Sequence, residues 1–254
     1  MSRRYPAHLG TSGWTYDHWS GRFYPADISR RTWFEYFSQH FDTVELNASF
    51  YRIPRESVVA SWHSRAPEHF VFSVKMSRLV THVKKLRNCD HELEWFFTVF
   101  KPLRTKIGMY LVQIPPSLKV NHELLQQFCE KLPPELPVTF EFRNKSWYVD
   151  ETYAILHKYN HNFCIHDMSG SATPRIVTGP AVYLRFHGYN ERYGGDYSDG
   201  ILSEWAEWIE KQRHKTPVYA YFNNDFEGFA VKNCLRLREM VEGVKAEISV
   251  HAGP

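Results

Sequence analysis

The sequence predicts an α/β fold of the (β/α)8 TIM-barrel type, in which eight parallel strands close into a ring and helices cover the outside. Short runs rich in β-branched and aromatic residues alternate with longer amphipathic runs along the whole chain. The length of 254 residues suits one such barrel, and no linker rich in Gly, Ser or Pro interrupts it. Polar residues collect at the C-terminal tips of the strand-like runs, where barrels of this type carry their active sites. We therefore expect one barrel domain over residues 1–254.

Each element of this barrel can be placed on the sequence. The expected strands are HLGTSGW (8–14), TVELN (43–47), FVFSVK (70–75), MYLVQI (109–114), VTFEFR (138–143), NFCIHD (162–167), AVYLRFHG (181–188) and VYAYFNN (218–224). Parallel strands need crossover connections of a dozen or more residues, and these connections are usually helical. The expected helices cover residues 31–41, 56–66, 91–103, 121–132, 150–160, 202–215 and 228–241.

The composition is that of a globular, mildly basic protein. Hydrophobic residues make up 43% and charged residues 23%, with a formal net charge of +3 and a pI near 8.6. A net charge of this size does not by itself indicate a nucleic-acid-binding protein, and it favours an anionic partner only weakly. No apolar run is long enough for a signal region or a bilayer span, and the four cysteines lack the spacing of a zinc site. We expect a cytoplasmic protein without a membrane partner, and no pattern indicates an oligomeric state.

The stretch VYLRFHG (182–188) places charge in an otherwise buried strand. Side chains alternate along a strand, so Arg185 and His187 lie on one face. A charge in a core strand is costly unless it is paired or opens onto a site. The same spacing of two residues recurs at other strand tips, in the pairs Glu45 and Asn47, Ser73 and Lys75, and Glu141 and Arg143. We therefore expect these pairs to point inward at the C-terminal mouth of the barrel.

Seven motifs spread along nearly the whole chain carry a resemblance to a known family. They are GTSGW, VELNASFYRIP, FSVKMSRLVTH, LVQIPPSL, EFRNKSW, YLRFHG with a later YSDG, and YAYFNNDFEGFA. In this order they resemble the YecE-like family, a domain of unknown function numbered seventy-two. The resemblance implies a TIM-type barrel and brings no established reaction.

The polar tips favour an enzyme of the hydrolase or lyase type that acts on an anionic, phosphate-bearing ligand. Glu45 or Glu141 would act as general acid or base, and His187 is the third catalytic candidate. Lysine and arginine offer donors to an anion, and arginine grips phosphate through two parallel hydrogen bonds. The residues expected to bind substrate are Trp14, Asn47, Tyr51, Lys75, Gln113, Arg143, Trp147, Asp167, Arg185 and Asn223.

Three other interpretations stay open. The charged tips could form a structural ion-pair network. They could also bind an anionic metabolite or a nucleic acid without catalysis, since aromatic and basic loop residues suit stacking on bases. In a third interpretation, a metal-dependent endonuclease-like barrel, a divalent ion would be held by Glu45, Glu141, His166, Asp167 and His187. The interleaved lysine and arginines would repel a cation, so we expect neither a resident metal nor another cofactor.

Two local features complete the expectations. If the sixth strand is regular, His166 faces away from Arg185 and His187, as a packed or rim histidine. The segment GYNERYGGDYSDG (188–200) is rich in glycine and has no apolar periodicity, which favours either a mobile flap over the mouth or an ordered Ω-loop.

Overall fold

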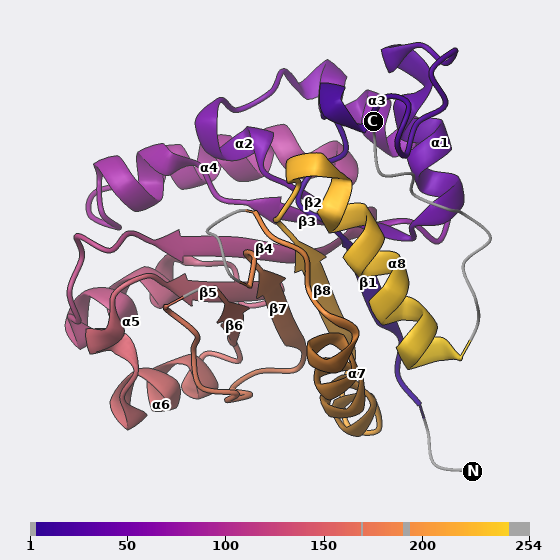
Figure 1. The fold of residues 1–254 in the computed structure, drawn as a ribbon. Coiled ribbons are helices and arrows are strands. Elements are labelled where there is room, and N and C mark those ends of the chain that lie inside the picture. Colours follow the sequence, from indigo (N-terminus) through magenta and orange to yellow (C-terminus); the bar gives the residue numbers. More distant parts are fainter. Residues whose placement is uncertain (1–3, 169, 190–193, 244–254) are drawn as a thin grey trace. The chain divides into compact units, whose positions relative to one another are not determined.

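The computed structural model describes residues 4–168, 170–189 and 194–243, and it confirms the predicted barrel (Figure 1). Eight parallel strands close in the order β1-β2-β3-β4-β5-β6-β7-β8. They are β1 (Ala7–Thr11), β2 (Thr43–Leu46), β3 (Val71–Lys75), β4 (Ile107–Ile114), β5 (Val138–Phe142), β6 (Asn162–Asp167), β7 (Val182–Phe186) and β8 (Val218–Phe222). The largest difference from the predicted strand ends is at β1. This strand stops before Gly13, whose φ of +96° lies outside the extended region.

The seven predicted helices are present, and the structure adds short turns that sequence periodicity did not reveal. The α-helices are α1 (Trp33–His40), α2 (Ala48–Tyr51), α3 (Glu56–Arg65), α4 (Asp90–Phe100), α5 (His122–Lys131), α6 (Asp150–Lys158), α7 (Asp199–Arg213) and α8 (Phe229–Glu242). Short 3-10 turns are η1 (Asp17–Trp19), η2 (Arg30–Thr32), η4 (Lys101–Lys106), η5 (Lys145–Trp147) and η6 (Phe226–Gly228), whereas η3 (Leu79–Val83) is a π-helical turn. Helix α2 is too short for a periodic signal. Among the described residues, the connection from β6 to β7 contains no helix.

The barrel divides into two compact units, which are described separately. The N/C unit comprises Met1–Val44, Ile165–Thr173 and Ala181–Pro254, and the middle unit comprises Glu45–Cys164 and Pro174–Pro180. In the N/C unit, β1 pairs with β2 and β8, β7 pairs with β8, and α7 and α8 lie side by side (Figure 1). In the middle unit, β4 pairs with β3 and β5, with Gln113 in register with Glu141.

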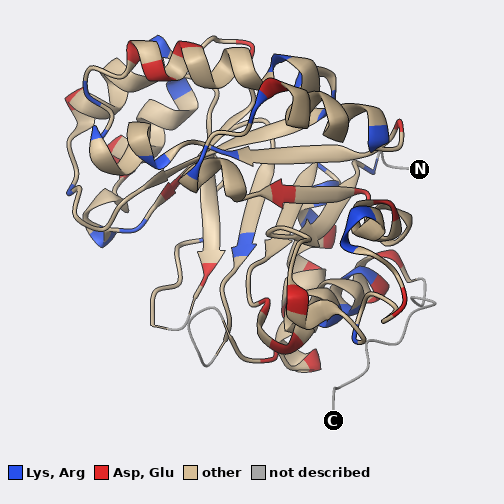
Figure 2. Cartoon of the chain, turned by 90° about the horizontal axis from the view of Figure 1, so that it is seen from above, with Lys and Arg blue, Asp and Glu red and all other residues tan. Residues whose placement is uncertain are grey.

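The strands form the core, and most charges lie on helices and loops. The strands are tan over most of their length in Figure 2, whereas the helices carry both colours. Close strand approach requires Gly10, because a Cβ atom there would lie 2.4 Å from the backbone oxygen of Thr43. All four cysteines are free and buried, and Cys164 lies within β6. Within the described part of the chain, no helix has the length and apolar character needed to cross a membrane.

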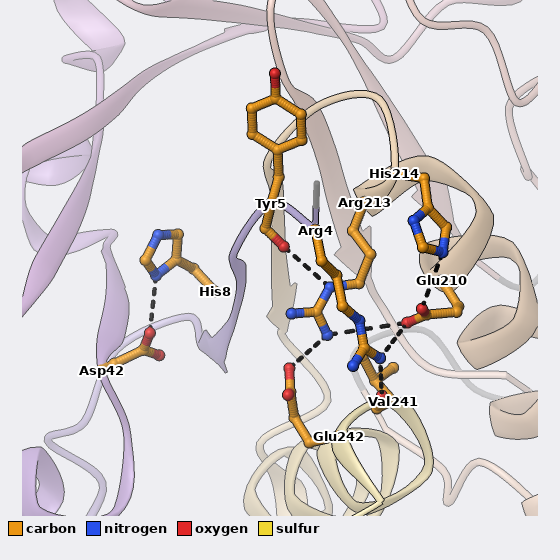
Figure 3. A network of polar contacts seen from close by, with 9 residues as sticks. All are labelled: Arg4, Tyr5, His8, Asp42, Glu210, Arg213, His214, Val241 and Glu242. Atoms are coloured by element: carbon orange, nitrogen blue, oxygen red, sulfur yellow. Dashed lines mark hydrogen bonds and ion pairs between the residues drawn. The ribbon is translucent and has the colours of Figure 1, made fainter. Parts of the chain in front are cut away.

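A polar network ties the start of the N/C unit to the ends of its two last helices (Figure 3). The Arg213 guanidinium, near the end of α7, donates from Nε to the Tyr5 carbonyl at 3.0 Å and from Nη1 to Glu242 at 2.6 Å. Arg4 donates to Glu210 at 2.7 Å and to the Val241 carbonyl at 3.2 Å. The network precedes β1, so it lies at the N-terminal end of the strands, the face that supports stability in such barrels.

Replacing Arg213 by methionine is expected to lower the free energy of unfolding by about 2 kcal/mol, because the side chain is only 8% exposed and the Tyr5 carbonyl and the Glu242 carboxylate lose their charged donor. Urea unfolding followed by tryptophan fluorescence measures this loss. The matched control is Arg236→Met on α8, which removes an exposed two-point pair with Asp199. That control should leave the unfolding midpoint nearly unchanged. Equal effects of the two changes would contradict a stabilising role for the buried network.

Candidate functional site

The middle unit brings three predicted site residues into one buried cluster at the C-terminal ends of β3 and β5. The Arg143 guanidinium lies 2.8 Å from the Glu141 carboxylate, and these side chains are only 5% and 0% exposed. The Lys75 ammonium lies 4.2 Å from the centre of the Phe50 ring, within cation–π range. The backbone holds these positions, because Arg143 N–H donates to the Ile114 carbonyl of the neighbouring strand. We call Lys75, Glu141 and Arg143, with Phe50, the middle-unit cluster.

Other predicted residues of the middle unit differ in how they are placed. Glu45 is fully buried in β2. Asn47 follows β2 at the start of α2, and its buried Oδ1 has no hydrogen-bond partner among the described residues. Gln113 is half-buried next to Glu141 in the sheet register. Tyr51, in contrast, is 75% exposed. Because the Oδ1 of Asn47 is buried without a hydrogen-bond partner among the described residues, it could accept a hydrogen bond from a ligand.

Trp147, predicted to bind substrate, is buried in the core. The side chain is fully buried, stacks on Phe142 at 4.8 Å between ring centroids, and donates its indole N–H to the Leu118 carbonyl at 2.8 Å. Position beside a strand tip suggested a ligand surface, but the only polar atom of the indole is used inside the core. Trp147 therefore packs in the core beside Phe142 at the end of β5, and its substrate-binding role stays a prediction.

His82 belongs to the surroundings of the middle-unit cluster, and the sequence interpretation missed it. It lies in the π-helical turn η3, with its ring edge-to-face on Phe50 at 4.9 Å. Thr81 Oγ1 lies 2.9 Å from its Nδ1. The residue ends the motif FSVKMSRLVTH, but no local periodicity in the sequence indicates the π-helical turn that places its ring against Phe50. Such turns occur frequently at functional sites.

Burial and neighbouring cations keep His82 neutral. Desolvation is the largest cause, and the positive charges of Lys75, Arg78 and Arg143 add to it, so the pKa of His82 falls to about 4. The negative charge of Glu141 opposes this shift. The three cations therefore have a larger effect on the pKa of His82 than the Glu141 carboxylate has. A surplus of positive charge of this kind suits an anion site.

The N/C unit holds a second cluster at the ends of β7 and β8, made of Arg185, His187 and Asn223. Arg185 Nη1 lies 3.3 Å from His187 Nε2, and Asn223 Nδ2 lies 3.1 Å from His187 Nδ1. A guanidinium only donates, so Nε2 accepts and a neutral imidazole carries its proton on Nδ1. An Asn223 amide that turns its oxygen to the ring matches this tautomer. His187 is thus an oriented ring whose two nitrogens are both engaged.

His166 and Asp167 are arranged the opposite way from the expectation. The His166 ring lies 6.0 Å from the His187 ring, so the prediction that it faces away is wrong. The Asp167 carboxylate instead accepts a hydrogen bond from the Trp205 indole of α7 at 3.2 Å. Side chains alternate along a strand, so only one of the neighbours His166 and Asp167 can face His187. His166 does so, and Asp167 points toward α7, where it contacts Trp205. The substrate-binding role predicted for Asp167 stays untested.

Parts of the expected aromatic rim and flap are anchored to the scaffold. Trp14 is half-buried against Phe34, with ring centroids 5.1 Å apart. In the segment 188–200, residues 190–193 lie outside the described residues. Beyond them, Tyr197 is 3% exposed and its N–H donates to Asn233 of α8 at 3.3 Å. Its hydroxyl accepts from Gly188 N–H at 3.2 Å. This described part resembles an ordered loop more than a flap.

The arrangement of the metal-ligating side chains bears on the third interpretation, a metal-dependent barrel. Among the described residues, no three His, Cys, Asp or Glu side chains gather closely enough to hold a metal ion. The carboxylate of Glu141 is paired with Arg143, and the His187 nitrogens face Arg185 and Asn223. The described geometry thus offers donors for an anion more readily than ligands for a cation.

Comparison with known proteins agrees with this barrel. The model of the family described as "Protein of unknown function DUF72" matches residues 8–253. UPF0759 protein YunF of Bacillus subtilis (strain 168) is 27% identical over 92% of this chain and 94% of its own length. UPF0759 protein YecE of Escherichia coli (strain K12) is 30% identical over 45% of this chain and 42% of its own length.

Solved structures of relatives have the same fold. A DUF72 family protein (TM1631) from Thermotoga maritima MSB8 superposes with a TM-score of 0.86 at 30% identity, over 94% of this chain and 100% of that chain. A DUF72 family protein (EF0366) from Enterococcus faecalis V583 gives a TM-score of 0.82 at 21% identity, over 98% of this chain and 99% of that chain, and supports the fold alone. The chain belongs to the DUF72 family, whose function is unknown.

Proposed function

We propose that the protein binds a phosphate-bearing anion at the C-terminal ends of its strands and acts on it as a hydrolase or lyase. The single observation that carries the proposal is the buried middle-unit cluster. Lys75 and Arg143 are cations with little exposure, and Arg143 lies 2.8 Å from the buried carboxylate of Glu141. Buried charge of this kind is costly and adds little stability, so a site that uses it explains its presence.

The roles within the cluster follow from chemistry. Arg143 presents a planar fork of donors, and Lys75 presents a compact charge, the combination that suits a phosphate group. Glu141 is the candidate general acid or base, because its carboxylate is held at the strand end next to the cations. Within the middle unit, Glu45 of β2 keeps its predicted catalytic role as part of the proposal. Within the N/C unit, His187 keeps its predicted catalytic role and Arg185 and Asn223 keep their predicted binding roles, as a second polar cluster at the ends of β7 and β8.

Binding without turnover is the second candidate, and the Glu141 contact favours it. A carboxylate 2.8 Å from a guanidinium is stabilised in its charged form and is a weaker base than a carboxylate without a cation. A nucleic acid is one form of the phosphate-bearing ligand. Its affinity would fall steeply as salt rises, because each phosphate contact releases counterions. A binding curve that ignores salt would therefore argue for a small ligand.

Replacing Glu141 by glutamine is expected to lower turnover about 100-fold or more, while anion affinity is kept or increased because one negative charge is lost. Release of inorganic phosphate from a panel of phosphate esters measures turnover, and competition with inorganic phosphate measures affinity. Glu94→Gln, at an exposed position of α4, is the control and should change neither. Wild-type protein that binds the anion and turns over no ester would identify the binding protein instead.

A further inference from the structure

His82 lies beside the middle-unit cluster, and its contacts suggest more than a packing role. It is half-buried, and its ring packs against Phe50, the same ring that the Lys75 ammonium faces. Its Nδ1 lies 2.9 Å from Thr81 Oγ1, whereas its Nε2 has no hydrogen-bond partner among the described residues and is not sealed from solvent. The Nε2 atom of His82 can thus form a hydrogen bond with a ligand that binds beside the cations of the middle-unit cluster.

We propose that His82 is a further residue of the anion site, which takes up a proton when a dianion of the phosphate type binds. The inference rests on the proposed anion site and deepens it, because it names the charge state of the ligand and the group that responds to it. Nε2 would become a donor to an anion oxygen. An imidazolium next to Lys75 and Arg143 is stable only when the ligand supplies the compensating negative charge.

The charges around the ring give the direction of this response. The cations that face His82 are Lys75 from β3, Arg78 just before η3, and Arg143 after β5, and Glu141 of β5 is the opposing carboxylate. Without a ligand these cations and burial favour the neutral ring. A dianion cancels much of the positive field and accepts a hydrogen bond from the protonated ring, and both effects favour imidazolium. By linkage, protonation of His82 strengthens dianion binding as much as the dianion strengthens protonation.

The competing explanation is a histidine that only packs on Phe50. Such a ring would keep its pKa when an anion binds elsewhere. A useful control lies in the same unit: His161 is 2% exposed and its pKa is also lowered to about 4, but by burial alone. General effects of salt or of anion binding on stability would move both histidines, whereas a local anion moves His82 alone.

The test is an NMR pH titration of the histidine Cε1–H resonances of the full chain, with sodium sulfate and with sodium chloride at equal ionic strength. Sulfate is a dianion over the whole range used. We expect sulfate to raise the pKa of His82 by about one pH unit or more, which corresponds to sulfate affinity about tenfold tighter at acidic pH, while His161 stays unchanged. The resonance is assigned from its loss in His82→Asn, or in His82→Gln if the first variant does not fold.

The outcomes separate this inference from the function on which it rests. Sulfate that perturbs the Arg143 side-chain resonances but leaves the pKa of His82 unchanged would overturn the role of His82 and leave the anion site standing. Sulfate that perturbs neither residue would overturn both. Calorimetry of sulfate binding in two buffers of different ionisation heat gives a second measure, because proton uptake makes the heat depend on the buffer. His82→Asn should abolish that dependence.

Discussion

Replacing Arg143 by methionine is expected to lower the free energy of unfolding by about 3 to 5 kcal/mol at neutral pH. The change removes the guanidinium 2.8 Å from the fully buried Glu141 carboxylate, and breaking a buried ion pair leaves a charge that the interior solvates poorly. Methionine keeps a similar apolar volume, so lost packing contributes little. Urea denaturation with a linear extrapolation measures the change, provided that the slope stays that of the wild type.

Two further variants test the physical reason. The double variant Glu141→Gln with Arg143→Met should recover most of the lost stability, because it removes both charges of the pair together and does not leave the Glu141 carboxylate without the guanidinium. Arg104→Met breaks an ion pair with Glu135 whose side chains are 58% and 56% exposed, and it should leave the midpoint nearly unchanged. A double variant no more stable than Arg143→Met would mean that the cost arises from packing and not from charge.

Acidification from pH 7 to pH 4 is expected to remove about 3 kcal/mol of stability through His161 alone. The ring is buried between Phe140 and Tyr159, and neither ring nitrogen has a hydrogen-bond partner among the described residues. Desolvation lowers its pKa from 6.5 to about 4 in the folded protein. The difference corresponds to about 3 kcal/mol at 1.36 kcal/mol for each pH unit.

The sign follows from proton binding. Above pH 6.5 the ring is neutral in both states and its contribution is fully present. As the pH falls from 6.5 toward 4, the unfolded chain binds a proton that the folded protein excludes, so the free energy of unfolding decreases. His161→Leu should show a smaller loss over this range than the wild type, whatever its stability at pH 7. Exposed His91→Leu is the control, and a profile of His161→Leu parallel to the wild type would refute the assignment.

The sequence by itself determined the barrel and most of the strand tips. Strand-like runs of period two, separated by helical runs, are local features, and a chain of parallel strands must close or be covered. The positions of Lys75, Glu141, Arg143, Arg185 and His187 at strand ends follow from these runs without any tertiary information. Spacing of two residues also placed Arg185 with His187, which the structure brings within 3.3 Å.

Only the tertiary structure decided which partners the side chains near those tips contact. In the structure the Trp147 indole N–H donates to the Leu118 carbonyl, and one oxygen of the Asp167 carboxylate accepts from the Trp205 indole, contacts that the sequence does not predict. His82 comes to Phe50 through a π-turn, which leaves no periodic pattern to recognise. Alternation defines the two faces of a strand, but partners distant in sequence select the face that is used, because hydrogen bonds and burial are settled by packing and not by local propensity.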